Sequence, residues 1–242
     1  MNFVIPMAGR GQRFIDAGYE VPKMLIEAHG KTLLEWSIDS LPLELCTNMV
    51  CILLREHELQ HNLSSIIKDK YGHRVNISFH YLDGVTQGQA ETVYLAKDLY
   101  NMDTDLVIFN IDTYFHSHTL SDALQRTDTD GVLGAFKSVE NRFSFAVTDV
   151  DGHVLKTAEK EVISNNALTG LYHFKHVQDF LETAEYHFKN DIRVNNEYYI
   201  APMYNYLISK GKTYTIDQVD NHHILGTPGE LIKFTEVAYD TL

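Results

Sequence analysis

The chain has 242 residues, 44% of them hydrophobic and 22% charged, which excludes an intrinsically disordered protein and suits one α/β domain. Its net charge is -13 at pH 7, from 33 acidic and 20 basic residues, so we expect no nucleic acid and no membrane as partners. We find neither the ~20 consecutive apolar residues of a membrane span nor a signal peptide, and we expect a cytoplasmic protein.

A glycine-rich, cationic segment follows the first predicted strand, residues 3–5. It covers residues 9–23, and a credible helix begins only near Thr32, where Glu35 completes a capping-box pattern. We therefore expect a long stretch without regular structure, although loops of more than ~12–15 residues are uncommon and usually functional or disordered. Its glycines allow backbone N–H groups to approach oxygen atoms closely, and its Arg and Lys side chains neutralise phosphates. The segment predicts a polyphosphate-binding loop.

Strand and helix patterns then alternate through the first half of the chain. We predict strands at residues 49–54, 75–82, 106–111 and 131–136, and helices at 32–41, 56–70, 89–99 and 119–126. This alternation predicts an α/β fold, a Rossmann-like, doubly wound and mostly parallel open sheet with helices on both faces. Ligands of such sheets bind beyond the carboxyl ends of the strands, so the loop, residues 83–88 and Asp112 should share one edge.

The second half begins with two short strands around a hairpin turn at Asp151-Gly152. We predict strands at residues 145–150, 153–157, 168–174 and 212–216, and helices at 177–189, 197–209 and 230–239. These strands should either extend the sheet or form a small lid over it. We expect residues 1–242 to form a single domain, with residues 1–136 as its nucleotide-binding part and residues 137–242 as its acceptor-binding part with the C-terminal helices.

Six segments resemble, in order, the motifs of the nucleotidylyltransferases that make nucleotide sugars. They are Ala8-Gly9-x-Gly11-x-Arg13-Phe14 with Pro22-Lys23, Thr86-Gln87-Gly88-Gln89-Ala90, Asn110-Ile111-Asp112, Glu159-Lys160, Ala167-Leu168-Thr169-Gly170-Leu171-Tyr172, and Ile224-Leu225-Gly226-Thr227-Pro228. The first and last of these segments also resemble short, single-domain members from bacterial capsule loci. That resemblance gives a slight preference for CTP as the nucleotide.

The resemblance implies a role for each matching residue. Arg13 would meet the β- and γ-phosphates, Lys23 the reacting phosphates, and Asp112 a Mg²⁺ ion, and these three residues would be catalytic. The nucleotide-binding residues would be Ala8, Gly9, Arg10, Gly11, Gln87 and Gly88. The acceptor-binding residues would be Glu159, Lys160, Thr169, Gly170 and Glu197.

One position departs from the family pattern. The closing motif normally starts with an aspartate, the second metal ligand, and here that position holds Ile224. Asp220, His222 or His223 would compensate from nearby, or the metal would rely on Asp112 and the phosphates, and the sequence does not decide between these. The remaining histidines, including the pair His116 and His118, are expected to be surface or capping residues because no third ligand is spaced for zinc.

The resulting prediction is an Mg²⁺-dependent nucleotidylyltransferase that uses an NTP and a phosphorylated small-molecule acceptor, a sugar 1-phosphate or a small phospho-alcohol or phospho-amide. One alternative is a glycosyltransferase of the GT-A type, which usually has Asp-x-Asp where this chain has Asn110, Asp112 and Tyr114. A second alternative is a non-catalytic nucleotide-binding protein, which Ile224 makes conceivable. A homo-oligomer is left open.

Overall fold

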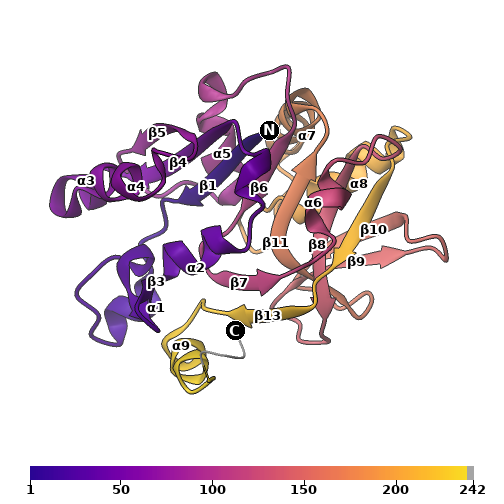
Figure 1. Ribbon diagram of the computed structural model, residues 1–242. Coiled ribbons are helices and arrows are strands. Elements are labelled where there is room, and N and C mark those ends of the chain that lie inside the picture. The colour runs from indigo at the N-terminus through magenta and orange to yellow at the C-terminus, as the bar shows by residue number, and fades with distance from the viewer. Residues whose placement is uncertain (239–242) are drawn as a thin grey trace.

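The computed structural model describes residues 1–238 and contains both strands and helices throughout the chain (Figure 1). The strands are Asn2–Met7 (β1), Glu27–Ala28 (β2), Lys31–Thr32 (β3), Asn48–Leu54 (β4), Asn76–Leu82 (β5), Leu106–Phe109 (β6), Thr113–His116 (β7), Gly131–Lys137 (β8), Ser144–Thr148 (β9), Val154–Glu159 (β10), Asn166–Phe174 (β11), Tyr214–Gln218 (β12) and Asn221–Ile224 (β13). The α-helices are Gln12–Asp16 (α1), Leu33–Asp39 (α2), Arg55–His61 (α3), Leu63–Tyr71 (α4), Gln89–Leu95 (α5), Leu120–Leu124 (α6), Val177–Lys189 (α7), Tyr204–Ser209 (α8) and Pro228–Thr235 (α9). Short 3-10 turns occur at Lys23–Leu25, Leu43–Leu45, Lys97–Leu99 and Ala201–Met203.

A nine-stranded sheet forms the centre of the molecule, in the order β10-β9-β11-β6-β1-β4-β5, with β8 pairing to both β11 and β12. Strands β6, β1, β4 and β5 are mutually parallel, as predicted for the first half of the chain. Strand β11 runs antiparallel to β6, β8 and β9, so the second half extends the same sheet. The predicted α/β, Rossmann-like fold is confirmed.

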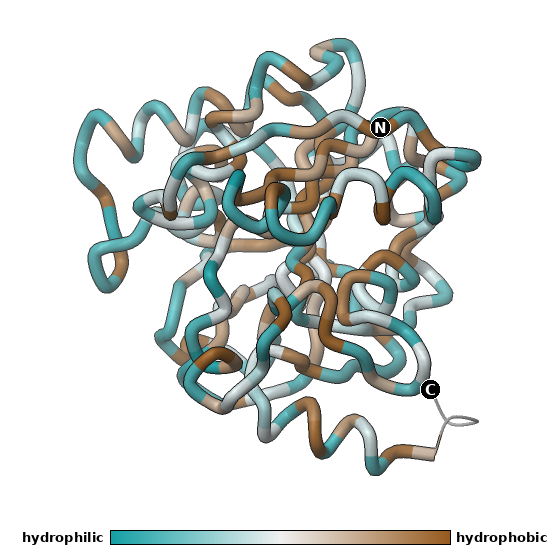
Figure 2. The backbone as a smooth tube through the Cα atoms, turned by 90° about the vertical axis from the view of Figure 1, so that its left-hand side faces the viewer, coloured by the Kyte–Doolittle hydropathy of each residue, from teal (hydrophilic) through white to brown (hydrophobic). Residues whose placement is uncertain are grey.

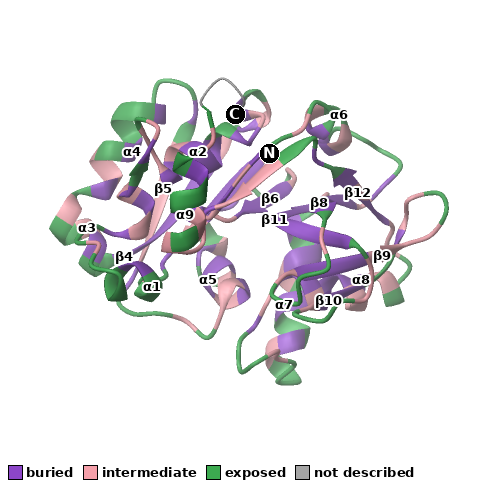
Figure 3. Ribbon diagram, turned by 90° about the horizontal axis from the view of Figure 1, so that it is seen from below, coloured by how far each residue is buried: buried purple, intermediate pink, exposed green. Residues whose placement is uncertain are grey.

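Helices cover both faces of the sheet, and alternate residues of each central strand contribute to different cores. Val4 of β1 packs with helices α5, α7 and α8, whereas its neighbours Phe3 and Ile5 pack with α2, α4 and α6. Apolar stretches of the chain gather in the interior of the molecule in Figure 2, and Figure 3 shows β11 fully buried. None of the helices within residues 1–238 is long and apolar enough to cross a membrane.

Several predicted elements differ from the structure. The loop at residues 9–23 contains a helix, α1, because the buried Phe14 ring anchors it against Tyr19 and the rest of a small apolar cluster. The predicted helix 56–70 is two helices, because Asn62 adopts the left-handed conformation between α3 and α4. The predicted helix 197–209 begins only at Ala201. The predicted helix 230–239 begins at Pro228 and already ends at Thr235, and residue 239 lies outside the described residues.

A two-stranded ribbon was not predicted at all. Strand β7 follows Asp112 directly and pairs antiparallel with β13, so that Ile224 lies opposite Thr113 (Figure 1). The ribbon matters for the candidate site because its pairing places Ile224, and with it the start of the segment that precedes α9, beside Asp112.

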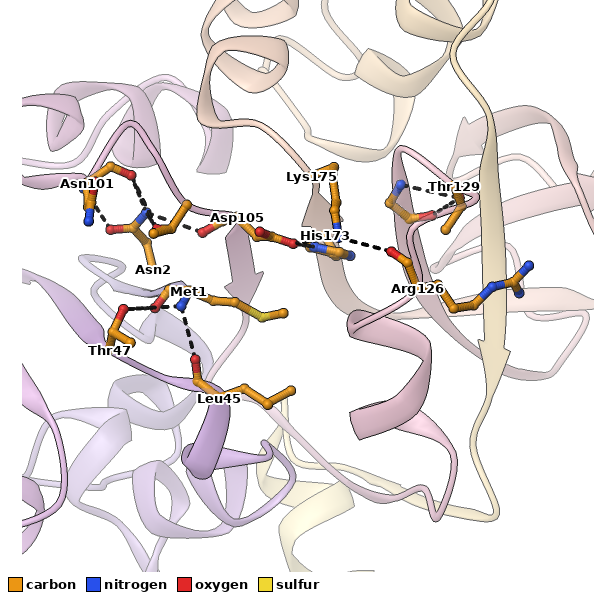
Figure 4. A network of polar contacts seen from close by, with 12 residues as sticks. Met1, Asn2, Leu45, Thr47, Asn101, Asp105, Arg126, Thr129, His173 and Lys175 are labelled. Carbon is orange, nitrogen blue, oxygen red and sulfur yellow. Dashed lines mark hydrogen bonds and ion pairs between the residues drawn. The ribbon is translucent and has the colours of Figure 1, made fainter.

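A buried polar network ties the amino end of β1 to neighbouring strands (Figure 4). Asn2 is fully buried; its side-chain amide donates to the Asn101 carbonyl at 2.8 Å, and its side-chain oxygen accepts from the Asn101 N–H. On the adjacent strands, the imidazole of His173 lies 3.0 Å from the Asp105 carboxylate, with Lys175 at 3.6 Å. These contacts lie at the end of β6 opposite to Asp112 and are structural.

This network predicts a loss of stability in mild acid. Burial lowers the pKa of His173 despite the neighbouring Asp105 carboxylate. In the unfolded chain the histidine titrates near ~6.5, so below that pH the unfolded state binds a proton that the folded state does not. Unfolding free energy should therefore fall between pH 7 and pH 5, by at most about 1.4 kcal/mol per pH unit for this group. Urea unfolding at several pH values measures this pH dependence of the unfolding free energy.

His173→Gln provides the comparison, because glutamine can donate to Asp105 but does not titrate. We expect a shallower pH dependence in this variant than in the unmodified protein. Equal slopes in both proteins would mean that other groups, not His173, set the acid sensitivity.

Candidate active site

The glycine-rich loop folds back onto the end of β6. Lys23, at the far end of the loop, places its ammonium 3.1 Å from Asp112 Oδ2. The Lys23 side chain is 13% exposed and that of Asp112 38%, so the pair faces an opening rather than bulk solvent. The structure thus brings together the loop cation and the strand-end carboxylate that the sequence placed at one edge of the sheet.

Two cavities open on either side of Asp112. The larger has a volume of about 590 Å³ and is formed by the first loop and by the turn before α5. Its lining comprises Pro6, Met7, Ala8, Gly9, Gly11, Lys23, Val85, Thr86, Gly88, Gln89, Thr92, Asn110, Ile111, Asp112, Glu197 and Tyr199. Most of the predicted nucleotide-binding residues therefore surround one space.

The smaller cavity has a volume of about 310 Å³ and lies over the antiparallel part of the sheet. Its lining comprises Arg13, Gln89, Asn110, Asp112, Thr113, Arg142, Phe143, Ser144, Glu159, Lys160, Leu168, Thr169, Gly170, Tyr172, Tyr199, Ile224, Gly226 and Glu230. Gln89, Asn110, Asp112 and Tyr199 line both cavities, so the two spaces meet at the Asp112 carboxylate. A reaction between two ligands, one in each cavity, would take place there.

The turn before α5 is held against the segment Glu197–Tyr199 by backbone hydrogen bonds. The Tyr198 N–H donates to the Gln87 carbonyl at 2.8 Å, and the Ala90 N–H donates to the Tyr198 carbonyl at 3.0 Å. Gly88 lies between them with φ of 132°, and a Cβ there would stand 2.6 Å from both the nitrogen and the oxygen of Tyr198. Only glycine permits this close approach of two chain segments.

Gly88→Ala is accordingly expected to destabilise the protein by roughly 1–3 kcal/mol and to weaken nucleotide binding, because the two backbones must separate. Urea unfolding and the KM for the nucleotide measure the two effects. Gly84→Ala in the same loop is the matched control, since a Cβ there meets nothing within 4 Å. Equal stability of the two variants would show that the contact between Gly88 and Tyr198 is not required for folding.

The smaller cavity holds a chain of polar contacts. The Lys160 ammonium contacts the Tyr199 hydroxyl and lies 4.5 Å from the centre of its ring, and Tyr199 donates to the Glu197 carboxylate. Glu159 accepts from the Ser144 hydroxyl, and burial raises the pKa of its carboxyl. The cavity therefore presents a cation, Lys160, and a half-buried acid, Glu159, that accepts from a hydroxyl group.

Other predicted residues lie outside both linings. Arg10 pairs with Glu56 at 3.3 Å, and the Gln87 N–H and side chain contact Glu91. Asp220 binds His118 at 2.7 Å at the other end of the ribbon, and His222 packs its ring 4.0 Å from that of Phe136. His223 stacks on Tyr114, so neither it nor Asp220 nor His222 approaches Asp112 as a lining residue.

Several lining residues were not singled out as site residues, and three of them bear on the geometry of the cavities. Arg142 and Glu230 form an ion pair across the smaller cavity, and Tyr199 separates the two cavities. The sequence pattern indicated Glu230 only as the start of a helix. The pairing of β7 with β13, which the sequence pattern did not indicate, brings Glu230 near Asp112.

Comparison with known proteins agrees with this geometry. The sequence profile described as nucleotidyl transferase matches residues 3–221. The solved structure of the nucleoside-diphosphate-sugar pyrophosphorylase from Vibrio cholerae RC9 superposes with a TM-score of 0.86 and 32% sequence identity, over 97% of this chain and 100% of that chain. The chain belongs to the nucleotidyl transferase family, which is a family of enzymes.

Curated relatives are more distant. A UTP–glucose-1-phosphate uridylyltransferase of Haloferax volcanii is 26% identical over 242 residues, which cover 94% of this chain and 92% of that protein. A glucose-1-phosphate thymidylyltransferase of Xanthomonas campestris pv. campestris is 27% identical over 177 residues, covering 71% of this chain. The chain spans only 59% of the length of the thymidylyltransferase.

Proposed function

We propose that this protein is an Mg²⁺-dependent nucleotidylyltransferase. It would transfer a nucleoside monophosphate from an NTP, CTP being slightly favoured, to a phosphorylated acceptor and release pyrophosphate. The observation that supports this best is the meeting of two cavities at Asp112, with Lys23 at the carboxylate and Lys160 in the wall of the smaller cavity. The NTP would occupy the larger cavity, and the acceptor the smaller one.

The reaction needs positioning and charge neutralisation rather than a general base. A phosphate monoester has a second pKa of about 6, so the acceptor is already largely a dianion at pH 7. One of its oxygens attacks the α-phosphorus, the bond from that phosphorus to the bridging oxygen breaks, and the electron pair leaves with pyrophosphate. Lys23, Arg13 and Lys160 would hold the anionic groups in line and balance their charge.

The residues also fit a divalent cation. Asp112 offers carboxylate oxygens, which Mg²⁺ prefers, at the place where the two cavities meet. A bound Mg²⁺ would neutralise negative charge on the triphosphate. In this structure Lys23 provides the positive charge beside Asp112 Oδ2.

The lining of the smaller cavity supports an acceptor class. Lys160 suits a phosphate, whereas Glu159 and Thr169 suit hydroxyl groups, so a sugar 1-phosphate or a small phospho-alcohol fits this lining better than an apolar acceptor. The activities for which two relatives are named, uridylyl and thymidylyl transfer to glucose 1-phosphate, support the same acceptor class and a pyrimidine nucleotide.

The test is a screen of CTP, UTP, dTTP, ATP and GTP against a panel of sugar 1-phosphates and small phospho-alcohols, with Mg²⁺ and pyrophosphate detection. We expect pyrophosphate only when one nucleotide and one acceptor are both present. If no combination in the panel releases pyrophosphate and calorimetry detects no nucleotide binding, the proposal is refuted. Tight nucleotide binding without turnover would instead favour the non-catalytic alternative, and glycosyl transfer from a nucleotide sugar the glycosyltransferase.

A further inference from the structure

Glu230 lies beside Asp112 because two independent parts of the fold direct it there. The Leu225 N–H donates to the Asp112 carbonyl at 2.7 Å, so the chain leaving β13 passes directly over the metal-site residue. Helix α9 then starts at Pro228, and the Thr227 hydroxyl accepts from the Glu230 N–H at 3.3 Å. Leu231 and Phe234 anchor this helix in the apolar cluster that also buries Phe14 of α1.

The two oxygens of the Glu230 carboxylate have different surroundings. Oε1 accepts from the Arg142 guanidinium. Oε2 is buried and has no hydrogen-bond partner within the part of the chain that the structure describes. A buried carboxylate oxygen without a donor is costly, so an unpaired one in the wall of a cavity calls for a ligand.

Gly226 shows how close this oxygen lies to Asp112. A Cβ placed on Gly226 would stand 3.4 Å from Glu230 Oε2 and 3.7 Å from Asp112 Oδ2. The two carboxylate oxygens, from residues far apart in the sequence, therefore both lie within contact distance of one point beside Gly226 and are at most about 7 Å apart. Its nearest apolar neighbour is Ile224, 3.9 Å from the same point.

We propose that Glu230 supplies the second carboxylate of the divalent-cation site, in place of the aspartate that this chain lacks at position 224. The inference rests on the proposed function and assigns a ligand that neither the family motif nor Asp220, His222 or His223 provides. Oxygen ligands from one or two carboxylates are what Mg²⁺ takes in nucleotide sites. Arg142 holds the other oxygen and so fixes the orientation of the carboxylate.

The test titrates the full-length protein with Mn²⁺ alone and follows free Mn²⁺ by electron paramagnetic resonance. Glu230→Gln should weaken Mn²⁺ binding at least about tenfold, because glutamine keeps the shape and accepts from Arg142 but carries no charge. Asp112→Asn should weaken it likewise. Glu236→Gln, an exposed residue at the end of the same helix, should leave the dissociation constant unchanged.

Two further variants separate metal ligation from a structural role of Glu230. Gly226→Ala makes only ordinary van der Waals contacts, so the thermal unfolding midpoint should stay the same while the methyl group occupies the space and Mn²⁺ binding is lost. Ile224→Asp in the Glu230→Gln background should regain Mn²⁺ affinity. Such a recovery would not follow if Glu230 served only to hold Arg142.

Unchanged Mn²⁺ affinity in Glu230→Gln, or no saturable Mn²⁺ site in the unmodified protein, overturns the inference. Because this titration contains neither nucleotide nor acceptor, its outcome is independent of the pyrophosphate screen. If the protein binds Mn²⁺ through Glu230 but releases no pyrophosphate in the screen, the assignment of Glu230 as a metal ligand stands and the proposed function is refuted.

Discussion

Asp112→Asn is expected to lower kcat about a thousandfold, equivalent to roughly 4 kcal/mol of transition-state stabilisation, while the fold remains intact. The substitution keeps the size of the side chain and removes the charge at the meeting point of the two cavities. Its amide oxygen can still accept from Lys23, and partly exposed ion pairs of this kind contribute only ~0–1 kcal/mol to stability. Steady-state kinetics at saturating Mg²⁺ and a thermal unfolding curve measure the two quantities.

Asp122→Asn is the matched control, because Asp122 is an exposed residue of α6 away from both cavity linings. Its kcat should equal that of the unmodified protein. A kcat for Asp112→Asn within about threefold of this control would show that the reaction does not use the charge of Asp112, contrary to the proposed site.

Arg13→Ala is expected to have the second-largest effect, a loss of about 10²–10³ in kcat/KM. Arg13 lines the smaller cavity and makes no ion pair or hydrogen bond within residues 1–238, so its removal leaves no unpaired partner. The guanidinium is thus available for a phosphate group, and its loss should leave the unfolding free energy nearly unchanged. Separate determination of kcat and KM for the NTP and for the acceptor identifies which substrate it meets.

Arg74→Ala, at an exposed arginine in the turn before β5 and outside both cavity linings, controls for the general loss of one positive charge on an acidic protein. If both variants lose the same modest activity, long-range electrostatics and not a direct contact explains the effect of Arg13. If only Arg13→Ala loses activity, and its KM for the acceptor rises, then Arg13 binds the acceptor and not the triphosphate that the family resemblance implied.

Local sequence patterns predicted most of the sheet and helices because those elements carry their own periodicity. Strand β4 is a continuous apolar run that is buried on both faces, and the capping box at Thr32 and Glu35 marks the start of α2. Asn62 shows where such patterns fail. The apolar positions of α3 and α4 keep a helical spacing across it, although the backbone breaks there.

The positions of the candidate site residues were predictable where motif residues follow strand ends, as Asp112 follows β6 and Lys23 closes the first loop. The role of Glu230 could not be predicted in this way. An acidic residue in the first turn of a helix is already favoured by the helix dipole, so its presence there does not indicate a binding site. Arg142 stands next to Glu140, and an ion pair between residues two apart gives no hint of a second partner in α9. Placing Glu230 and Arg142 at the candidate site required knowledge of the long-range pairing of β7 with β13. Strands of only four residues are too short for a recognisable alternation of apolar and polar residues.

Tyr199 belongs to the walls of both cavities, and this shared wall has a thermodynamic consequence. Its hydroxyl joins Lys160 to Glu197, and its neighbour Tyr198 is hydrogen-bonded to the turn at Gly88. A ligand that orders this segment from one side would order it for the other side as well, so we expect the two proposed occupants to bind cooperatively. Linkage then makes the effect reciprocal, since each ligand must change the affinity for the other by the same factor.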